Sequence, residues 1–358
     1  MFTQRNRQEL EDFGYTVVPG VLSHSECDSY IKEYNDWIKQ FKNGKWPQSK
    51  SSLIFSYNVG NLDVTWKIRV KSKRVFEQLW GTSKLLSSVD ALAIGRPPEN
   101  GQEHFAEEGF HWLHTDQSAA RMGLHAYQGA VYLENAEEDD WTFYLMKGSH
   151  KYAQEFYDTH EKQAFKSTIN EYFQLRDEDV TWYEERGCQT VRLPVPKGGI
   201  VLWDSRLIHA NARPIKGRRN PGRWRYTVFV CMAPAIWATE EDMGIRKELF
   251  NVAGRTSHWP FQGIRFSLPN THNDDGIIYP KEVPPSGRTD EAKRLWGALP
   301  YNFDDGESNG PDYVPKLDPR YTKFIYTPPK PTNKYGRNII IGLGLLAAFA
   351  AFVWMKRR

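Results

Sequence analysis

The stretch Trp112-Leu113-His114-Thr115-Asp116 decides how the whole chain is interpreted. In a β-strand, side chains two positions apart point to the same face, so a strand here would place an imidazole beside a carboxylate. Such a pair can hold one metal ion from adjacent positions. A second histidine from a distant strand would complete a 2-His-1-carboxylate set, which leaves coordination positions open for other ligands. A three-residue pattern also arises by chance, so this prediction depends on the residues downstream.

The best downstream partner for this pair is His209, which ends a strand-like apolar stretch that begins at Gly199. Two arginines come after it, Arg223 and Arg225, and Arg225 opens the next strand-like run. A planar guanidinium can bind a carboxylate through two parallel hydrogen bonds. The sequence therefore predicts a metal ion and, one strand beyond its distal histidine, a site for a carboxylate.

Short strands dominate the part of the chain after this pair. An amphipathic helix precedes it, and Ser23 and Glu26 form the S-x-x-E pattern that caps a helix. Further helices are expected over residues 74–90 and 238–260. Many short strands after early helices predict a closed β-sandwich or barrel flanked by helices. The expected strands are residues 89–95, 126–133, 141–146, 189–195, 200–203 and 226–232.

Five short motifs, taken in their order, resemble the phytanoyl-CoA dioxygenase family. The opening residues 13–23 also resemble the start of that family, and the similarity covers roughly residues 9–235. Residues 254–260 are a candidate extension of it. No single motif is specific, but the five together in this order are. The motifs are His114-Thr115-Asp116-Gln117, Gln128-Gly129, Gly148-Ser149-His150, His209 and Arg225.

The resemblance implies a fold and a set of cofactors. The fold is mainly β with flanking helices, built on a double-stranded β-helix core of the jelly-roll or cupin-like kind. The cofactors are Fe(II) and 2-oxoglutarate, used with O2 and with ascorbate as a supporting reductant. By the same resemblance, His114, Asp116 and His209 hold the iron. Related halogenases replace the carboxylate with a small residue, so Asp116 favours hydroxylation of an organic substrate.

The resemblance also assigns residues to 2-oxoglutarate. Arg225 is expected to bind its distal carboxylate, and Asn211 stands where the family often has a Ser or Thr that hydrogen-bonds the cosubstrate. Asn can still donate a hydrogen bond. The loop before Arg225 is longer than usual in the family, so Arg223 competes with it for this role. Arg225 is preferred because the strand residues after it match the family's register better.

The C-terminal part differs in composition from the rest. Residues 1–237 are expected to form the oxygenase domain, and residues 238–333 a C-terminal extension that wraps the core and ends in a Pro-rich linker. Residues 339–355 contain no charged residue, are close to the minimum length for spanning a bilayer, and precede three cations. They predict a transmembrane helix, and thus a single-pass membrane protein whose catalytic domain faces the cytosol. A small-molecule or lipid-like substrate would then be within reach.

The charge and the cysteine content bear on two further properties, nucleic-acid binding and disulfide formation. The net charge is +3, but without the five cations of residues 334–358 the chain has 42 basic and 44 acidic residues. The globular part is thus nearly neutral, which gives no reason to expect nucleic-acid binding. The three cysteines are widely spaced, so free thiols are expected. Two other functions stay open, namely a catalytically inactive membrane-tethered β-helix that binds a partner, and a cupin-like metalloenzyme that does not use 2-oxoglutarate.

Other polar residues near the motifs have two interpretations each. His258 can line the pocket or pack against Trp259, and packing is preferred. Asp204 can orient His209 from behind or cap the turn after its strand. His111 lies close to the metal motif but has no carboxylate two residues later.

Overall fold

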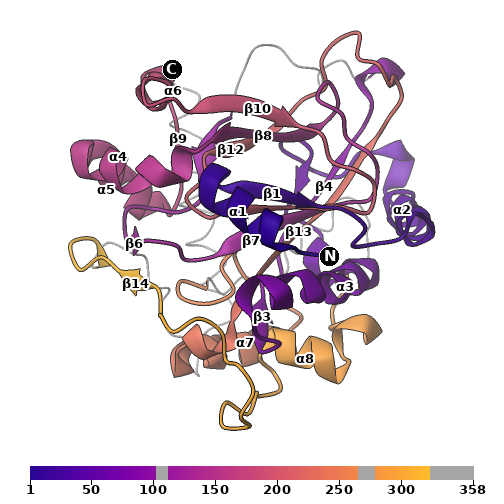
Figure 1. Cartoon of the computed structure of the whole chain (residues 1–358). Coiled ribbons are helices and arrows are strands. Elements are labelled where there is room, and N and C mark those ends of the chain that lie inside the picture. Colours follow the sequence, from indigo (N-terminus) through magenta and orange to yellow (C-terminus); the bar gives the residue numbers. More distant parts are fainter. Residues whose placement is uncertain (102–111, 265–278, 323–358) are drawn as a thin grey trace, which may run out of the picture. The chain divides into compact units, whose positions relative to one another are not determined.

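The computed structural model describes residues 1–101, 112–264 and 279–322. Residues Met1–Ile325 form one compact unit, and Figure 1 shows how its elements are arranged. The α-helices are α1 (Gln4–Phe13), α2 (His24–Ile38), α3 (Asp63–Trp80), α4 (Ala153–Thr159), α5 (Glu161–Asn170), α6 (Asp177–Glu184), α7 (Glu240–Asn251) and α8 (Asp290–Trp296).

Two antiparallel sheets form the centre of this unit. The larger has seven strands in the order β1-β11-β7-β13-β4-β2, with β3 also paired to β13, and the smaller has five in the order β10-β8-β12-β5-β9. A short third sheet pairs β14 with β6. The strands are β1 (Tyr15–Val18), β2 (Leu53–Ile54), β3 (Leu85–Ser87), β4 (Leu92–Gly95), β5 (His114–Thr115), β6 (Arg121–Met122), β7 (Tyr127–Tyr132), β8 (Thr142–Lys147), β9 (Phe173–Gln174), β10 (Gln189–Leu193), β11 (Ile200–Asp204), β12 (His209–Ala212), β13 (Arg225–Pro234) and β14 (Lys316–Leu317).

The two main sheets pack face to face. One hydrophobic cluster joins Tyr132 and Trp203 of the larger sheet to Phe143 and Leu145 of the smaller one. Phe143 and Leu145 are two positions apart on β8, so both project from the same face of their strand. This cluster fills the space between the sheets, and the candidate site lies in the same layer.

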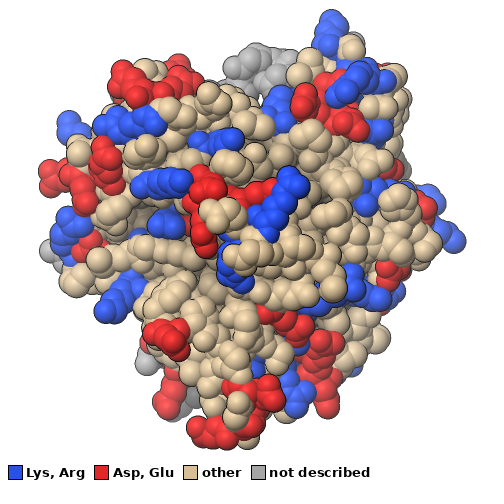
Figure 2. Space-filling view, viewed as in Figure 1, with Lys and Arg blue, Asp and Glu red and all other residues tan. Residues whose placement is uncertain are grey.

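Helices cover the outer face of the larger sheet. The largest hydrophobic cluster unites α2, α3, α7 and α8 with β11 and β13, and α3 lies alongside this sheet in Figure 1. Gly129 of β7 permits the close approach, because a Cβ at this position would lie 3.2 Å from Cζ of Phe76 and 3.0 Å from Cδ1 of Ile200. Acidic and basic side chains are interspersed over the face shown in Figure 2.

The predicted local structure is confirmed in part. Ser23 and Glu26 cap α2 reciprocally, with both Ser23 N–H and Glu26 N–H bonded to the other residue's side chain. The helix expected over residues 74–90 instead ends at Trp80, because Gly81 turns the chain with φ +68°, and β3 comes next. The helix expected over 238–260 ends at Asn251 as α7.

The predicted fold class is wrong in two respects. First, the fold contains both α-helices and β-strands rather than being mainly β. The helices α3, α2 and α7 have 18, 15 and 12 residues, whereas the longest strand has 10. The aromatic composition and the strand motifs indicate the sheets, but the helices are needed to bury the outer face of the larger sheet. The core consists of two facing antiparallel sheets with helices packed outside the larger one.

Second, the membrane part of the prediction is not supported. Within the described residues no helix is long and apolar enough to cross a membrane. Even the longest one, α3, carries charged residues throughout its 18 positions and buries only one face. This finding overturns the predicted transmembrane helix, the single-pass membrane location with a cytosolic catalytic domain, and the membrane as a partner. Residues 339–355 themselves lie outside the described part of the chain.

Candidate metal centre

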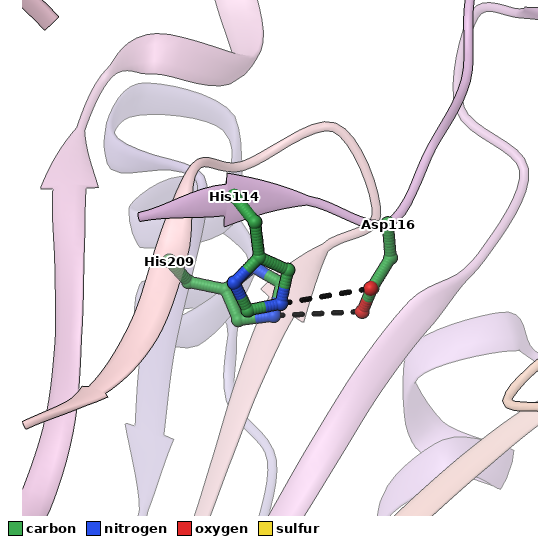
Figure 3. A group of neighbouring side chains, drawn as sticks. All are labelled: His114, Asp116 and His209. Atoms are coloured by element: carbon green, nitrogen blue, oxygen red, sulfur yellow. Dashed lines mark ion pairs between the residues drawn. The ribbon is translucent and has the colours of Figure 1, made fainter. Parts of the chain in front are cut away.

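Two histidines on paired strands meet one carboxylate. His114 of β5 and His209 of β12 stand directly opposite each other in the antiparallel register, and Asp116 comes just after the end of β5 (Figure 3). His114 Nε2 lies 3.6 Å from Asp116 Oδ1, and His209 Nε2 lies 3.5 Å from Asp116 Oδ2. The three ligand atoms lie within 4.8 Å of one another. The structure therefore brings together the three residues that the sequence predicted as metal ligands.

Backbone hydrogen bonds fix which nitrogen of each imidazole is free. His114 Nδ1 donates to the Trp112 carbonyl at 2.9 Å, and His209 Nδ1 donates to the Leu207 carbonyl at 2.9 Å. A carbonyl only accepts, so the proton of each neutral ring is on Nδ1. Each Nε2 then presents a lone pair toward Asp116, which is the arrangement that a metal-binding histidine needs.

Electrostatics favours the same protonation states. Burial lowers the pKa of His114 to about 4, and the neighbouring His209 adds to this effect. Burial alone would raise the pKa of Asp116, but His258, His209 and His114 outweigh it and hold that pKa well below its usual value. Near neutral pH the site thus combines neutral His114 with an ionised carboxylate, as binding of a divalent cation requires.

Gln128 holds the carboxylate in place. Its Nε2 donates to Asp116 Oδ2 at 2.9 Å from β7, in the opposite sheet. The family motifs contained Gln128, but no role was predicted for it. Position along the chain does not reveal that β7 lies across the core from β5.

A cavity of about 320 Å³ opens beside these residues. Its walls come from both sheets and from residues 257–259, beyond α7. Aromatic and aliphatic side chains provide most of the exposed wall, and polar groups are set among them, as is usual for a small-molecule site. The lining residues are Leu53, Phe55, Ser88, Asp90, Ala91, Trp112, His114, Asp116, Gln128, Gly129, Phe143, Asn170, Glu171, Tyr172, Trp203, His209, Ala210, Asn211, Phe229, Val230, Cys231, Ser257, His258 and Trp259.

Arg225 lies just behind one wall of the cavity. Its Nη2 donates to Asn211 Oδ1 at 2.7 Å, its Nε to Thr227 Oγ1 at 3.1 Å and its Nη1 to Ser52 Oγ at 3.3 Å. Arg225 is only 2% exposed, and among the described residues no carboxylate pairs with it. Asn211 lines the cavity, whereas Arg225 itself does not. The structure thus joins the two residues predicted to bind the cosubstrate.

The alternative residues have other partners. Arg223 pairs with Asp140 at 2.7 Å, away from the cavity. Asp204 pairs with Arg206 at 2.6 Å and accepts from the Arg206 backbone N–H at 2.8 Å, so of its two interpretations the structure favours the cap of the turn after β11. His258 does both things proposed for it, since it lines the cavity and its ring centroid lies 4.8 Å from that of Trp259. His111 lies outside the described residues.

Two imidazole Nε2 atoms and one carboxylate form the donor set that mononuclear non-haem iron oxygenases use. The sequence profile of the phytanoyl-CoA dioxygenase family matches residues 10–215, more than half of the chain, and the chain belongs to this family. It is 26% identical over 284 residues to the "Ava biosynthesis cluster protein O" of Aspergillus versicolor, covering 74% of this chain and 84% of that protein.

Two of the solved structures that the chain resembles are described as holding bound Fe or as α-ketoglutarate-dependent. EctD from S. alaskensis with bound Fe matches with 14% identity and a TM-score of 0.45, over 64% of this chain and 76% of that one. The α-ketoglutarate-dependent carbocyclase SnoK from nogalamycin biosynthesis matches with 13% identity and a TM-score of 0.43, over 79% and 93%.

Family membership confirms three of the predictions. The chain is a member of the phytanoyl-CoA dioxygenase family, it is a 2-oxoglutarate-dependent dioxygenase, and its cofactors are Fe(II) and 2-oxoglutarate. The donor set at the meeting point of the two sheets fits Fe(II) in type, number and protonation. The predicted enzyme class, an oxidoreductase, was therefore correct. Membership of this family does not by itself identify the substrate of the enzyme.

Proposed function

We propose that the protein hydroxylates a small organic molecule in the cavity beside His114, Asp116 and His209, and that these three residues hold the iron. The observation that carries this proposal is the convergence of their ligand atoms within 4.8 Å on one side of a largely apolar cavity. Bound Fe(II) and 2-oxoglutarate would supply the oxidising power, with O2 as co-reactant. The presence of Asp116 leaves no ligand position vacated for a halide, which favours hydroxylation.

Arg225 and Asn211 are the proposed anchors for the distal carboxylate of 2-oxoglutarate. A buried guanidinium without a carboxylate partner is costly, and an organic anion would offset that cost. Arg225 meets this condition among the described residues, whereas Arg223 already pairs with Asp140 at 2.7 Å. Asn211 lies two residues after His209 on β12, so both side chains face the same way. The amide would then link the anchor to the metal side of the cavity.

The chain's own residues position the reactants and exclude water. The two backbone carbonyls that bind Nδ1 of His114 and His209 keep both rings in one tautomer, and Gln128 holds Asp116. Phe143 and Trp203 pack beside His209, with ring centroids 5.4 and 5.1 Å from it. Such packing fixes the ring and leaves a low-dielectric site around the reacting atoms.

The proposed domain organisation places the catalytic domain in residues 1–237 and a supporting extension in residues 238–333. Helices α7 and α8 of the extension join the hydrophobic cluster around α3. The extension also contributes His258 and Trp259 to the cavity. It therefore takes part in shaping the site for a small-molecule substrate as well as in covering the core.

Succinate formation by the full chain with Fe(II), 2-oxoglutarate, ascorbate and O2 tests the proposal. Enzymes of this class consume 2-oxoglutarate slowly even without substrate. We expect Asp116→Ala to abolish this turnover and Arg225→Ala to raise the 2-oxoglutarate KM at least about tenfold, because a charge-assisted pair is lost. Arg223→Ala is the matched control and should leave KM within about twofold. Absence of both turnover and 2-oxoglutarate binding in the metal-loaded wild type would refute the proposal.

A further inference from the structure

One end of the cavity carries polar groups that have no role in holding iron or cosubstrate. The lining of the cavity includes four such groups from two segments of the chain, Ser88, Asp90, Ser257 and His258. The two segments that carry them are tied by a reciprocal pair of hydrogen bonds, since Val89 N–H donates to Thr256 Oγ1 at 2.8 Å and Thr256 N–H donates to the Val89 carbonyl at 3.0 Å. The groups are therefore held in a fixed arrangement.

Two of these groups lack a side-chain partner within the described part of the protein. The Nε2 of His258 is buried without a hydrogen bond. Asp90 has a hydrogen bond from the Ala91 backbone, but no cation among the described residues forms an ion pair with it, whereas Glu171, the other acidic lining residue outside the metal centre, contacts Arg121 at 3.5 Å. Burial raises the pKa of Asp90, and His258 acts in the opposite direction. A buried nitrogen without a hydrogen bond, or a carboxylate without a cation, is costly, so a ligand that supplies the missing partner gains affinity.

This end lies beside the iron site and away from the proposed cosubstrate anchor. Gln128, which binds Asp116, is opposite Cys231 on β13, and Cys231 N–H donates to Ser88 Oγ at 3.1 Å. Tyr132, near the Arg225 end, is opposite Thr227. Gln128 and Tyr132 are four residues apart on one strand, or about 13 Å. A molecule bonded at the Asp90 end would thus lie next to the metal and leave the Arg225 end to 2-oxoglutarate.

Charge balance indicates the kind of group that fits. Fe(II) and Arg225 together offset Asp116 and doubly charged 2-oxoglutarate, so the bound site would be neutral without Asp90. Arg255 acts on Asp90 electrostatically from beyond ion-pair distance, and its Nη1 is hydrogen-bonded to the Phe55 carbonyl. The surrounding wall is aromatic, with Phe55, Trp112 and Trp259 among its residues.

We infer that Asp90, with His258 beside it, is the substrate-recognition group, and that the substrate is a largely apolar small molecule that carries a basic nitrogen. This inference rests on the proposed function. The nitrogen donates a charge-assisted hydrogen bond to the Asp90 carboxylate, which turns a neighbouring C–H of the substrate toward the iron. A hydroxyl or amide N–H on the substrate would also donate a hydrogen bond to Asp90, but without a positive charge. Charged and neutral probe molecules therefore distinguish a cationic donor from a neutral one.

Binding of three matched probes to the full chain tests the inference. The probes are 2-phenylethylamine, 2-phenylethanol and 2-phenylethyl methyl ether, which share one apolar body and carry a cationic donor, a neutral donor and no donor. Equilibrium dialysis with Fe(II) and 2-oxoglutarate under anaerobic conditions measures binding without turnover. We expect the amine to bind best and the ether worst. In Asp90→Asn the amine should bind about tenfold more weakly and the alcohol less than about threefold, because only the charge assistance is lost.

Asp36→Asn is the matched control, since it removes an exposed carboxylate that pairs with Lys39 and should change none of the three affinities. The ranking on the wild-type chain needs no variant, so misfolding of Asp90→Asn does not prevent the test. Equal binding of amine and alcohol, equal binding of all three, or no binding at millimolar concentration overturns the inference. If the wild type forms no succinate from 2-oxoglutarate, the proposed function fails instead, whatever the probes do.

Discussion

Two pairs of buried histidines show how differently this fold treats the same side chain. His114 and His209 are 5% and 6% exposed, and His125 and His150 are 0% and 5% exposed, so burial does not separate them. The first pair donates from Nδ1 and leaves Nε2 free toward a carboxylate. The second pair uses Nε2 to bond the carbonyls of distant residues, at 3.0 and 3.2 Å. A free Nε2 facing a carboxylate marks the candidate ligand, and a bonded Nε2 marks the structural histidine.

The largest expected effect comes from removing one free Nε2. His209→Ala should lower iron retention and succinate formation by more than about 100-fold, because even residues that only support ligands cost 10- to 100-fold. Iron content after gel filtration and succinate yield measure the two effects. The matched control is His150→Gln, whose amide can still donate to the Glu11 carbonyl and which should retain its iron. Comparable iron loss in both variants would remove the distinction between the two pairs.

A smaller effect is expected where a side chain only holds a ligand. Gln128→Leu removes the 2.9 Å bond to Asp116 and should weaken iron binding about 10- to 100-fold. Titration of the metal-free protein with Fe(II) under anaerobic conditions measures this affinity. Gln117 provides the control, because its Nε2 donates to the carbonyls of Arg121 and Gly123 and not to a ligand.

Gln117→Leu should therefore lower thermal stability and leave iron affinity nearly unchanged. Both glutamines belong to the family motifs, so this pair of variants asks whether their roles differ as their contacts do. Equal iron affinity in wild type and Gln128→Leu would mean that the carboxylate keeps its position without Gln128.

The sequence alone indicated the three candidate metal ligands, because strand periodicity and motif order are local properties. His114 and Asp116 lie two positions apart, and His209 ends an apolar run, so both signals can be read along the chain. Gln128 and Asp90 could not be assigned in this way. Their roles depend on which strands and loops meet across the core, and the reciprocal bonds between Val89 and Thr256 join segments far apart in sequence.

The fold class was predicted wrongly, although the three candidate ligands do lie together in the structure, and the reason is related. Residues 74–90 carry a helical pattern, yet the helix stops at Gly81 and the next residues pair with β13 as β3. Pairing with a strand from the far end of the domain outweighs local propensity there. The predicted helical content was also too low. Helices are needed to cover the larger sheet, and this need arises only when the sheet is packed in the folded protein. The membrane prediction rested on composition alone and was not supported by any helix of the described residues.

The smallest expected effect concerns the structural pair and appears as a pH dependence of stability. Burial lowers the pKa of His125 to about 3, and Arg121 adds to this effect. In the unfolded chain the imidazole has a pKa of about 6.5, so below that pH the unfolded state binds the extra proton and the folded state does not. The stability that neutral His125 provides is therefore present above about pH 6.5 and declines as the pH falls toward about 3.

His125→Gln isolates this contribution, since glutamine can donate to the Lys316 carbonyl but does not titrate. Urea unfolding of the metal-free proteins at pH 7.5 and pH 5.5 gives the two free energies of unfolding. The wild type should lose about 1.4 kcal/mol more than the variant over this interval, which corresponds to one pH unit below the unfolded pKa. Equal losses would show that His125 takes up its proton in the folded protein over the same pH range as in the unfolded chain. Its ring would then not belong with the neutral, bonded histidines that define the structural pair.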